Sequence, residues 1–96
     1  MESDDFEWDD AKAVSNFSKH GVTFGEAATV FSDPMSVSFP DPDHSLDEDR
    51  YLTIGVSASG RTVIVSHTDR DNRIRIISAR TATHREKQGY ENGTFP

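Results

Sequence analysis

Three apolar segments with alternating polar residues follow one another between residues 51 and 79, separated only by short polar turns. They read YLTIGV, TVIVSHT and RIRIISA. Alternation with a period of two is typical of strands that bury one face, and connections this short join only antiparallel neighbours. The segments therefore predict an antiparallel meander, which limits the chain to folds built around a small sheet.

A helix is predicted well before this meander, over residues 10–20. Asp9 suits its N-cap, and Gly21 suits the left-handed residue that ends a helix. Val14 and Phe17 recur at helical spacing inside it. This spacing predicts an apolar stripe along the helix.

The pattern T-x-x-E occurs twice, at Thr23–Glu26 and at Thr83–Glu86. In a capping box the threonine side chain accepts a hydrogen bond from the backbone N–H of the glutamate. The glutamate side chain in turn accepts one from the backbone N–H of the threonine. The first pattern predicts a second helix that ends at Asp33–Pro34, and the other predicts a short C-terminal helix.

Two further strands are predicted, at residues 6–9 and 35–39. The expected order is β-α-α-β-β-β-β-α, in a single α+β domain over residues 1–96. Its two layers would be an antiparallel sheet and two N-terminal helices on one sheet face, with a C-terminal helix added. Residues 1–5 and 93–96 are expected to be frayed tails.

The composition is acidic and contains no cysteine, with a formal net charge of −7. Without cysteine, disulfides and thiolate metal sites are excluded, and a reducing cytoplasm is the expected location. The acidic N-terminus lacks the apolar run of a signal peptide, and no stretch reaches the roughly 20 apolar residues of a membrane helix. The acidic segment 41–49 is interpreted as a surface loop, and neither a metal nor a cofactor is expected.

The charge is unevenly distributed along the chain. Residues 1–50 carry 13 acids and 3 bases, whereas residues 51–96 carry 4 acids and 7 bases. Five arginines fall within SHTDRDNRIRIISARTATHRE, residues 66–86. They either form ion pairs with the protein's own acids or bind an external anion such as phosphate through their guanidinium forks.

The pairing of the last two strands predicts which face holds the arginines. If DRDN is a four-residue loop, residue 68 stands opposite residue 73, and opposed residues share a face. The expected core face collects Val63, Val65, His67, Ile74 and Ile76. The expected open face collects Ile64, Ser66, Thr68, Arg73, Arg75 and Ile77. Tyr51 and Thr53 would extend this open face, and a bulge would change the assignment.

Two segments carry a resemblance to a known family. WDDAKAVSNFSKHGVTFGEAATVFSDP, residues 8–34, resembles the opening of the BrnT toxins of bacterial type II toxin–antitoxin systems, W-D-x-x-K-x-x-x-N-x-x-K-H-G-V-x-F-x-x-A. Residues 50–91 resemble the rest of the family pattern, most strongly in H-T-x-R and R-I-I-S-A-R-x-A-T-x-R-E. The resemblance covers about residues 6–91, almost the whole chain.

The resemblance implies a RelE-like fold and an endoribonuclease that cleaves RNA without a metal ion and inhibits translation. It also implies a ribbon-helix-helix antitoxin, with which the toxin represses its own operon. Operator DNA would be contacted only through that complex, and the toxin alone would be a monomer. The acidic charge supports an alternative, a weak or inactive toxin-fold protein that acts as antitoxin partner and co-repressor.

Cleavage of RNA without a metal requires groups that move protons and groups that stabilise charge on the phosphate. Arg75 and Arg80 are the candidates for charge stabilisation. His67 is the candidate acid or base, although the strand pairing places it on the core face. Substrate binding is expected from Arg70, Arg73, Arg85 and Lys19.

Three other residues have both a structural and a functional interpretation. Glu86 could act as the base, but its capping role already accounts for it. His20, with its neighbour Lys19, could belong to a site, but electrostatics at a helix end explains both. Trp8 could stack on a base, but it is expected to pack in the core.

Overall fold

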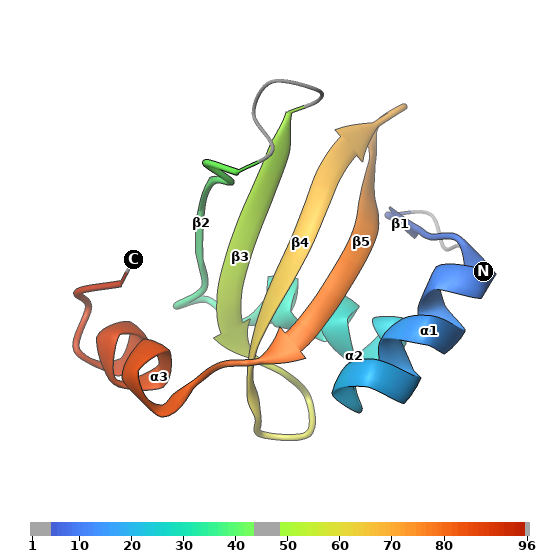
Figure 1. Cartoon of the computed structure of the whole chain (residues 1–96). Helices are drawn as coiled ribbons and strands as arrows, with labels where there is room; N and C mark the ends of the chain where they lie inside the picture. The colour runs from blue at the N-terminus through green and yellow to red at the C-terminus, as the bar shows by residue number, and fades with distance from the viewer. Residues whose placement is uncertain (1–4, 44–48, 96) are drawn as a thin grey trace.

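The sheet has the strand order β1-β5-β4-β3-β2 in a computed structural model that describes residues 5–43 and 49–95 (Figure 1). The strands are β1 (Phe6–Glu7), β2 (Val37–Pro40), β3 (Arg50–Val56), β4 (Thr62–Arg70) and β5 (Arg73–Thr81). The helices are α1 (Asp10–His20), α2 (Phe24–Thr29), the 3₁₀ helix η1 (Val30–Ser32) and α3 (His84–Glu91). The predicted order of elements and the antiparallel meander are confirmed. The sheet is nevertheless mixed, because β1 lies parallel to β5.

β2 begins later than predicted, at Val37. The Asp33 carboxylate accepts a hydrogen bond from the Met35 backbone N–H at 2.9 Å, and the Asp33 carbonyl accepts one from Ser36 at 3.0 Å. These bonds form a turn before the strand, so Met35 remains exposed. The acidic loop that follows β2 was expected over residues 41–49, and its residues 44–48 lie outside the described ones.

The hydrophobic core lies between the sheet and the segment that holds α2 and η1. It is formed by Val22, Phe24, Ala27, Val30, Val63, Val65, Ile76 and Ala79. Trp8 packs edge-on against Phe24 with ring centroids 5.9 Å apart, as its expected core role requires. α1 and α2 lie on the same side of the sheet, as predicted, with α1 beside β5 (Figure 1).

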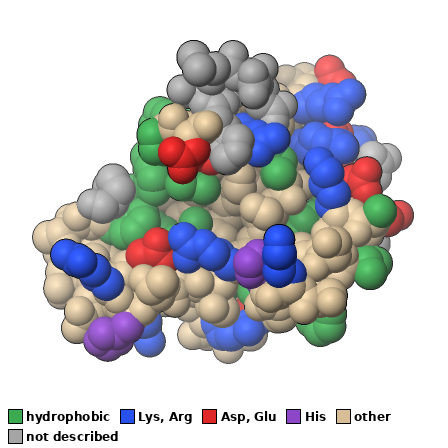
Figure 2. All heavy atoms as spheres, in the orientation of Figure 1, with side chains coloured by type: hydrophobic (Ala, Val, Ile, Leu, Met, Phe, Trp, Pro, Cys, Tyr) green, Lys and Arg blue, Asp and Glu red, His purple; other side chains and the backbone are tan. Residues whose placement is uncertain are grey.

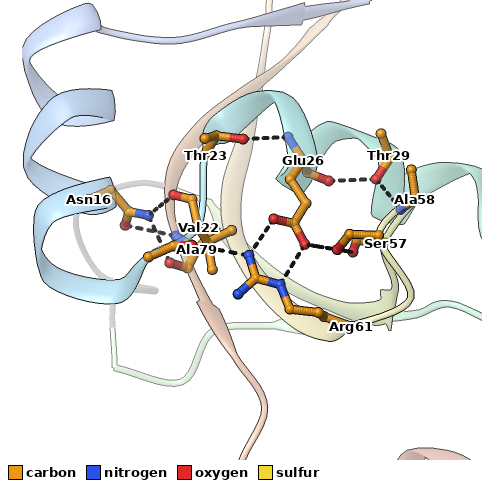
Figure 3. A network of polar contacts seen from close by, with 11 residues as sticks. Asn16, Val22, Thr23, Glu26, Thr29, Ser57, Ala58, Arg61 and Ala79 are labelled. Atoms are coloured by element: carbon orange, nitrogen blue, oxygen red, sulfur yellow. Dashed lines mark hydrogen bonds and ion pairs between the residues drawn. The ribbon is translucent and has the colours of Figure 1, made fainter.

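α1 has the predicted N-cap and C-cap, but its apolar stripe does not face the core. Val14 and Phe17 are 72% and 56% exposed, whereas the polar Asn16 is buried. The Asn16 amide binds both the carbonyl and the N–H of Ala79, at 2.8 and 3.0 Å (Figure 3). β1 pairs only with the start of β5, so Asn16 satisfies backbone groups on an edge that lacks a neighbouring strand.

The first T-x-x-E motif forms only half of the predicted capping box. Thr23 Oγ1 accepts a hydrogen bond from the Glu26 N–H at 3.0 Å. The Glu26 carboxylate does not return to Thr23 but accepts hydrogen bonds from Ser57, Ser59 and Arg61 (Figure 3). This network ties the β3–β4 turn to the start of α2.

The hairpin between β4 and β5 is tighter than predicted. Asp71 and Asn72 have φ angles of 52° and 65°, as the central residues of a two-residue type I′ turn require. Arg70 therefore pairs with Arg73, and Thr68 pairs with Arg75 instead of Arg73. The prediction of a four-residue loop is wrong, but a register difference of two residues leaves each side chain near the turn on its predicted face.

A bulge then interrupts the ladder between Ser66 and His67. Ser66 pairs with Ser78 whereas His67 pairs with Ile76, so Ile77 is the extra residue on β5. The bulge reverses the alternation along the rest of β5. Arg80 therefore lies opposite Ile64, on the same face as Arg75. Regular alternation would place Arg80 on the core face.

The prediction that Tyr51 and Thr53 extend the open face is wrong. Tyr51 pairs with His67 and Thr53 pairs with Val65, so both share the core face. Thr53 is fully buried there, and its hydroxyl lies 2.7 Å from Nε2 of His67. The open face instead takes Leu52 and Ile54 from β3, because these pair with Ser66 and Ile64.

α3 lies at the β2–β3 side of the sheet, away from α1 (Figure 1). The Tyr90 hydroxyl donates a hydrogen bond to the Asp33 carboxylate, and Phe95 packs on Phe39 with centroids 5.3 Å apart. Thr94 and Phe95, expected in a frayed tail, fold back so that both backbone N–H groups bind the Gly89 carbonyl. None of the helices among the described residues has the length and apolarity that crossing a membrane requires.

Candidate functional site

The arginines of the open face form two separate groups. Arg70, Arg73 and Arg75 lie near the hairpin turn, whereas Arg80 lies five residues further along β5. At about 3.3 Å per residue, Arg75 and Arg80 are roughly 15 Å apart along the strand. Figure 2 shows Lys and Arg side chains at the upper right of this face and, separately, others across its lower part. The five arginines of residues 66–86 therefore do not form one continuous patch.

Acidic side chains accompany the hairpin group. Nη1 of Arg75 donates to the Glu7 carboxylate at 2.8 Å, across the β1–β5 pairing. Asp69 and Asp71 line a hollow at the turn together with Arg70 and Arg73. Arg75 thus pairs with one of the protein's own acids, which was one of the two interpretations of the arginine-rich stretch.

Arg80 is held by the second T-x-x-E motif. Its Nη1 and Nη2 atoms donate to the two carboxylate oxygens of Glu86 at 2.7 and 3.0 Å. Glu86 also accepts a hydrogen bond from the Thr83 N–H at 2.8 Å, so this capping box is complete as predicted. The pKa of Glu86 is lowered to about 2, mainly because its carboxylate accepts hydrogen bonds from the Arg80 guanidinium. The Arg80 side chain is still 43% exposed, and its position and orientation are fixed.

A cavity of about 300 Å³ opens beside Arg80 on the face shown in Figure 2. It is lined by His20, Leu52, Ile64, Ser66, Ser78, Ala79 and Arg80. The bulge gives Ser78 and Arg80 their places on this face. Asn16 fixes the end of α1 at the edge of β5, and His20, the last residue of α1, reaches the cavity from there.

The chemistry of this cavity is more specific than a charged surface. An imidazole, a guanidinium and two hydroxyls surround a space that also has apolar walls from Leu52 and Ile64. Histidine is the side chain best suited to proton transfer near neutral pH. Arginine binds phosphate oxygens through parallel N–H donors. The arrangement can therefore bind a phosphodiester and move a proton beside it.

His67 lies on the other side of the sheet. It is 6% exposed, packs edge-on against Phe31 at 4.9 Å and bonds Thr53 through Nε2. Burial lowers its pKa, an effect that Asp69 partly opposes. The structure therefore does not bring His67 together with Arg75 and Arg80, because the sheet separates them.

The remaining predicted residues lie at the periphery. Lys19 is exposed in the last turn of α1, next to His20. Arg85 is exposed on α3 and lines a second cavity. Among residues 5–43 and 49–95, no three histidine, aspartate or glutamate side chains are grouped as metal ligands would be.

His20, Ser66 and Ser78 line the cavity but were not selected as site residues from the sequence: His20 was attributed to helix-end electrostatics, and Ser66 was placed only on the open face. The position of His20 before Gly21 is fully explained by helix termination, so the local pattern carries no further signal. The tertiary contact between Asn16 and Ala79 brings this end of α1 to the cavity. The KHG triplet of the family resemblance is the one sequence signal that includes His20.

The fold and the cavity define a small α+β protein with a histidine of α1 and an arginine of β5 beside one cavity on the open sheet face. The sequence model of the family described as "Ribonuclease toxin, BrnT, of type II toxin-antitoxin system" matches residues 8–86. The chain therefore belongs to the BrnT family of ribonuclease toxins, which confirms the resemblance read from its sequence. Membership of a toxin–antitoxin family implies a cognate antitoxin.

A solved structure agrees with the family assignment. The chain is similar to the 1.1 Å crystal structure of the Brucella abortus ribonuclease toxin BrnT, with 24% sequence identity and a TM-score of 0.67. The match covers 85% of this chain and all of the other. At this identity the likeness shows the fold alone. No curated protein sequence matches the chain significantly.

Proposed function

We propose that the chain is an endoribonuclease that cleaves RNA without a metal ion, at the cavity between His20 and Arg80. The observation that carries the proposal is the presence of an imidazole, a guanidinium and two serine hydroxyls around one open cavity. Family membership supports RNA as the substrate. Arg80 keeps its expected role of charge stabilisation, and His20 takes the role of acid or base that the sequence assigned to His67.

In this reaction the ribose 2′-oxygen attacks the adjacent phosphorus to form a 2′,3′-cyclic phosphate. The bond from phosphorus to the 5′-oxygen breaks, and that oxygen takes up a proton from water. Arg80 would bind the phosphoryl oxygens, where negative charge develops. His20 would accept the proton of the 2′-hydroxyl. Ser66 and Ser78 would donate hydrogen bonds to the phosphate. Glu86 would act as a positioning residue, because both its carboxylate oxygens are engaged by Arg80.

The other arginines would bind RNA beyond the cleaved bond. Arg73 and Arg75 lie on β5 and Arg70 lies at the end of β4, near the hairpin turn and on the same face as the cavity. Arg85 and Lys19 would add phosphate contacts from α3 and α1. The net charge of −7 does not prevent this, because exposed charges further apart than about 8–10 Å are largely screened at working salt.

We also propose that the free chain inhibits translation in the cytoplasm, and that a ribbon-helix-helix antitoxin neutralises it. The antitoxin is supported by family membership and its type by the sequence resemblance. A basic DNA-binding antitoxin would complement the N-terminal half of the chain, with its 13 acids and 3 bases in residues 1–50. The complex, and not the toxin alone, would bind operator DNA.

A second function, that of a catalytically weak antitoxin partner and co-repressor, is favoured by one observation. The guanidinium groups of Arg75 and Arg80 are both engaged by carboxylates, Glu7 and Glu86. A phosphate would have to compete with these carboxylates for both arginines.

Induction of the chain alone in bacteria tests both functions. The ribonuclease predicts growth arrest that Arg80→Ala relieves, and cleavage of RNA by the purified protein in the presence of a chelator. Absence of growth arrest and of cleavage, with and without ribosomes, would contradict it. Co-purification with a small basic DNA-binding protein, without nuclease activity, would select the co-repressor.

A further inference from the structure

A second cavity, of about 530 Å³, lies between α3 and the C-terminal residues that fold back on it. It is lined by Arg85, Glu86, Gln88, Gly89, Asn92, Thr94 and Phe95. Gly93, with φ of 74°, reverses the chain, and the Thr94 and Phe95 N–H groups bind the Gly89 carbonyl at 2.8 and 3.0 Å. The Phe95 ring rests on Phe39. The walls of the cavity are therefore fixed by backbone hydrogen bonds and an aromatic contact.

The polar side chains of this cavity come from one face of the helix. Arg85, Gln88 and Asn92 follow one another at spacings of three and four residues, which places them in one stripe. Within the described part of the chain, none of these three side chains forms a hydrogen bond or an ion pair. Two carboxamides and a guanidinium thus remain available to a ligand, next to an aromatic ring.

The cavity adjoins the proposed catalytic one. Glu86 lines it, and the Glu86 carboxylate holds Arg80, which lines the cavity that contains His20. One ion pair therefore separates the two spaces. Arg80 and the second cavity are thus connected through one residue of α3, Glu86.

We propose that this second cavity binds the base of a nucleotide next to the cleaved bond, and that the base is a purine. The proposal rests on the ribonuclease function stated above and names a specificity site for it. Asparagine and glutamine carboxamides pair with N6 and N7 of adenine, and arginine pairs with O6 and N7 of guanine. Phe95 offers a ring on which a base stacks. Pyrimidines have no N7, so the hydrogen bonds to N7 can form with purines only.

A titration that needs no cleavage tests the site directly. AMP, GMP, CMP and UMP are added to the ¹⁵N-labelled protein, and the side-chain amide signals of Gln88 and Asn92 are followed by NMR. Purine nucleotides should shift these signals and bind about tenfold more tightly than pyrimidine nucleotides. Equal affinities, or shifts confined to other residues, would overturn the proposal.

Two variants complete the test. Gln88→Ala with Asn92→Ala should abolish the purine preference, whereas Lys87→Ala, an exposed change on the same helix outside the cavity, should retain it. In cleavage of DNA oligonucleotides that contain a single ribonucleotide, the double variant should lose about tenfold in kcat/KM on purine-flanked sites only. A loss on pyrimidine-flanked sites as well would indicate general damage and overturn the assignment.

The two proposals fail in different ways. Cleavage that depends on Arg80 but shows no purine preference would remove the base site and leave the ribonuclease. Purine binding at Gln88 and Asn92 in a protein that cleaves no RNA would remove the ribonuclease and leave the binding site.

Discussion

The two T-x-x-E motifs begin alike and end in different networks. In both motifs the threonine hydroxyl accepts a hydrogen bond from the backbone N–H of the glutamate. In both, a neighbouring arginine lowers the pKa of the glutamate to about 2. Glu26 binds Arg61 and two serines of the β3–β4 turn, on the helix side of the molecule (Figure 3). Glu86 returns to its own cap and binds Arg80 beside the open cavity.

The exposure of the two arginines does not explain the difference. The side chains of Arg61 and Arg80 are 41% and 43% exposed. Arg61 donates a further hydrogen bond to the Gly21 carbonyl, so both its Nε and its Nη2 bind groups of the protein itself. Arg80 borders a cavity that also holds His20. The surroundings of the ion pair, and not the motif, separate the structural network of Glu26 from the network proposed to be functional.

The largest expected effect separates the two arginines by activity. Arg80→Ala should lower kcat for RNA cleavage by about 10²–10³-fold, as loss of a donor to developing charge typically does. Arg61→Ala should leave kcat nearly unchanged while it lowers stability. Cleavage of a labelled RNA, compared at equal folded concentration, measures both. An equal loss of kcat in the two variants would mean that the ion pairs serve only the fold.

The next largest effect concerns the proton-transfer group. His20→Gln should lower kcat by about 10²-fold, the lower end of the range for a lost acid or base. The matched control is His84→Gln, because His84 is exposed at the start of α3. The pH–rate profile of the wild type should lose one limb in His20→Gln. An unchanged profile would remove His20 from the reaction.

A stability measurement sharpens the contrast between the glutamates. Glu26→Gln should lower the free energy of unfolding by about 1–2 kcal/mol, because two serines and an arginine lose a charged acceptor. Glu86→Gln should cost about 0–1 kcal/mol, since the Glu86 side chain is more exposed than that of Glu26, 25% against 14%, and accepts no hydrogen bond from a serine. Urea unfolding of both variants provides the comparison. The reverse order would show that the capping box stabilises the protein more than the turn network does.

Acid should weaken the same two networks. Both glutamates have a pKa of about 2 in the folded chain, below the ordinary 4.5. As pH falls, the two glutamates of the unfolded chain take up protons before those of the folded chain do. The contribution of the two carboxylates to the free energy of unfolding is therefore complete above pH 4.5 and is lost as pH falls towards 2. Wild type should lose stability across that window, and the double variant Glu26→Gln with Glu86→Gln should lose less. Parallel curves would contradict the pKa assignments.

The smallest expected effect concerns His67. Burial lowers its folded pKa below the ordinary 6.5, so its contribution to stability is present above pH 6.5 and is lost as pH falls below it. The stability of His67→Leu relative to wild type should therefore improve as pH falls from 7 to 5. Cleavage should persist in this variant. A loss of cleavage in a fully folded His67→Leu protein would return His67 to the reaction.

Much of the fold could be predicted from local patterns. The meander follows from the alternation between residues 51 and 79, and the caps at Asp9 and Thr83 follow from short-range hydrogen bonds. The faces of Arg73 and Arg75 were predicted correctly although the length of the β4–β5 turn was not. The observed register differs from the predicted one by two residues, and such a difference keeps each side chain on its face. The bulge at Ile77 could not be predicted, and it decides the face of Arg80.

The sequence by itself determined the elements, their order and the family, because each depends on residues close together in the chain or on a pattern read along it. The tertiary structure decided the site. Asn16 meets Ala79 across 63 residues, and Glu26 meets Arg61 across 35. These contacts bring His20 to the cavity and direct Glu26 away from its cap. No local preference encodes them, since they form only when helices and strands pack together.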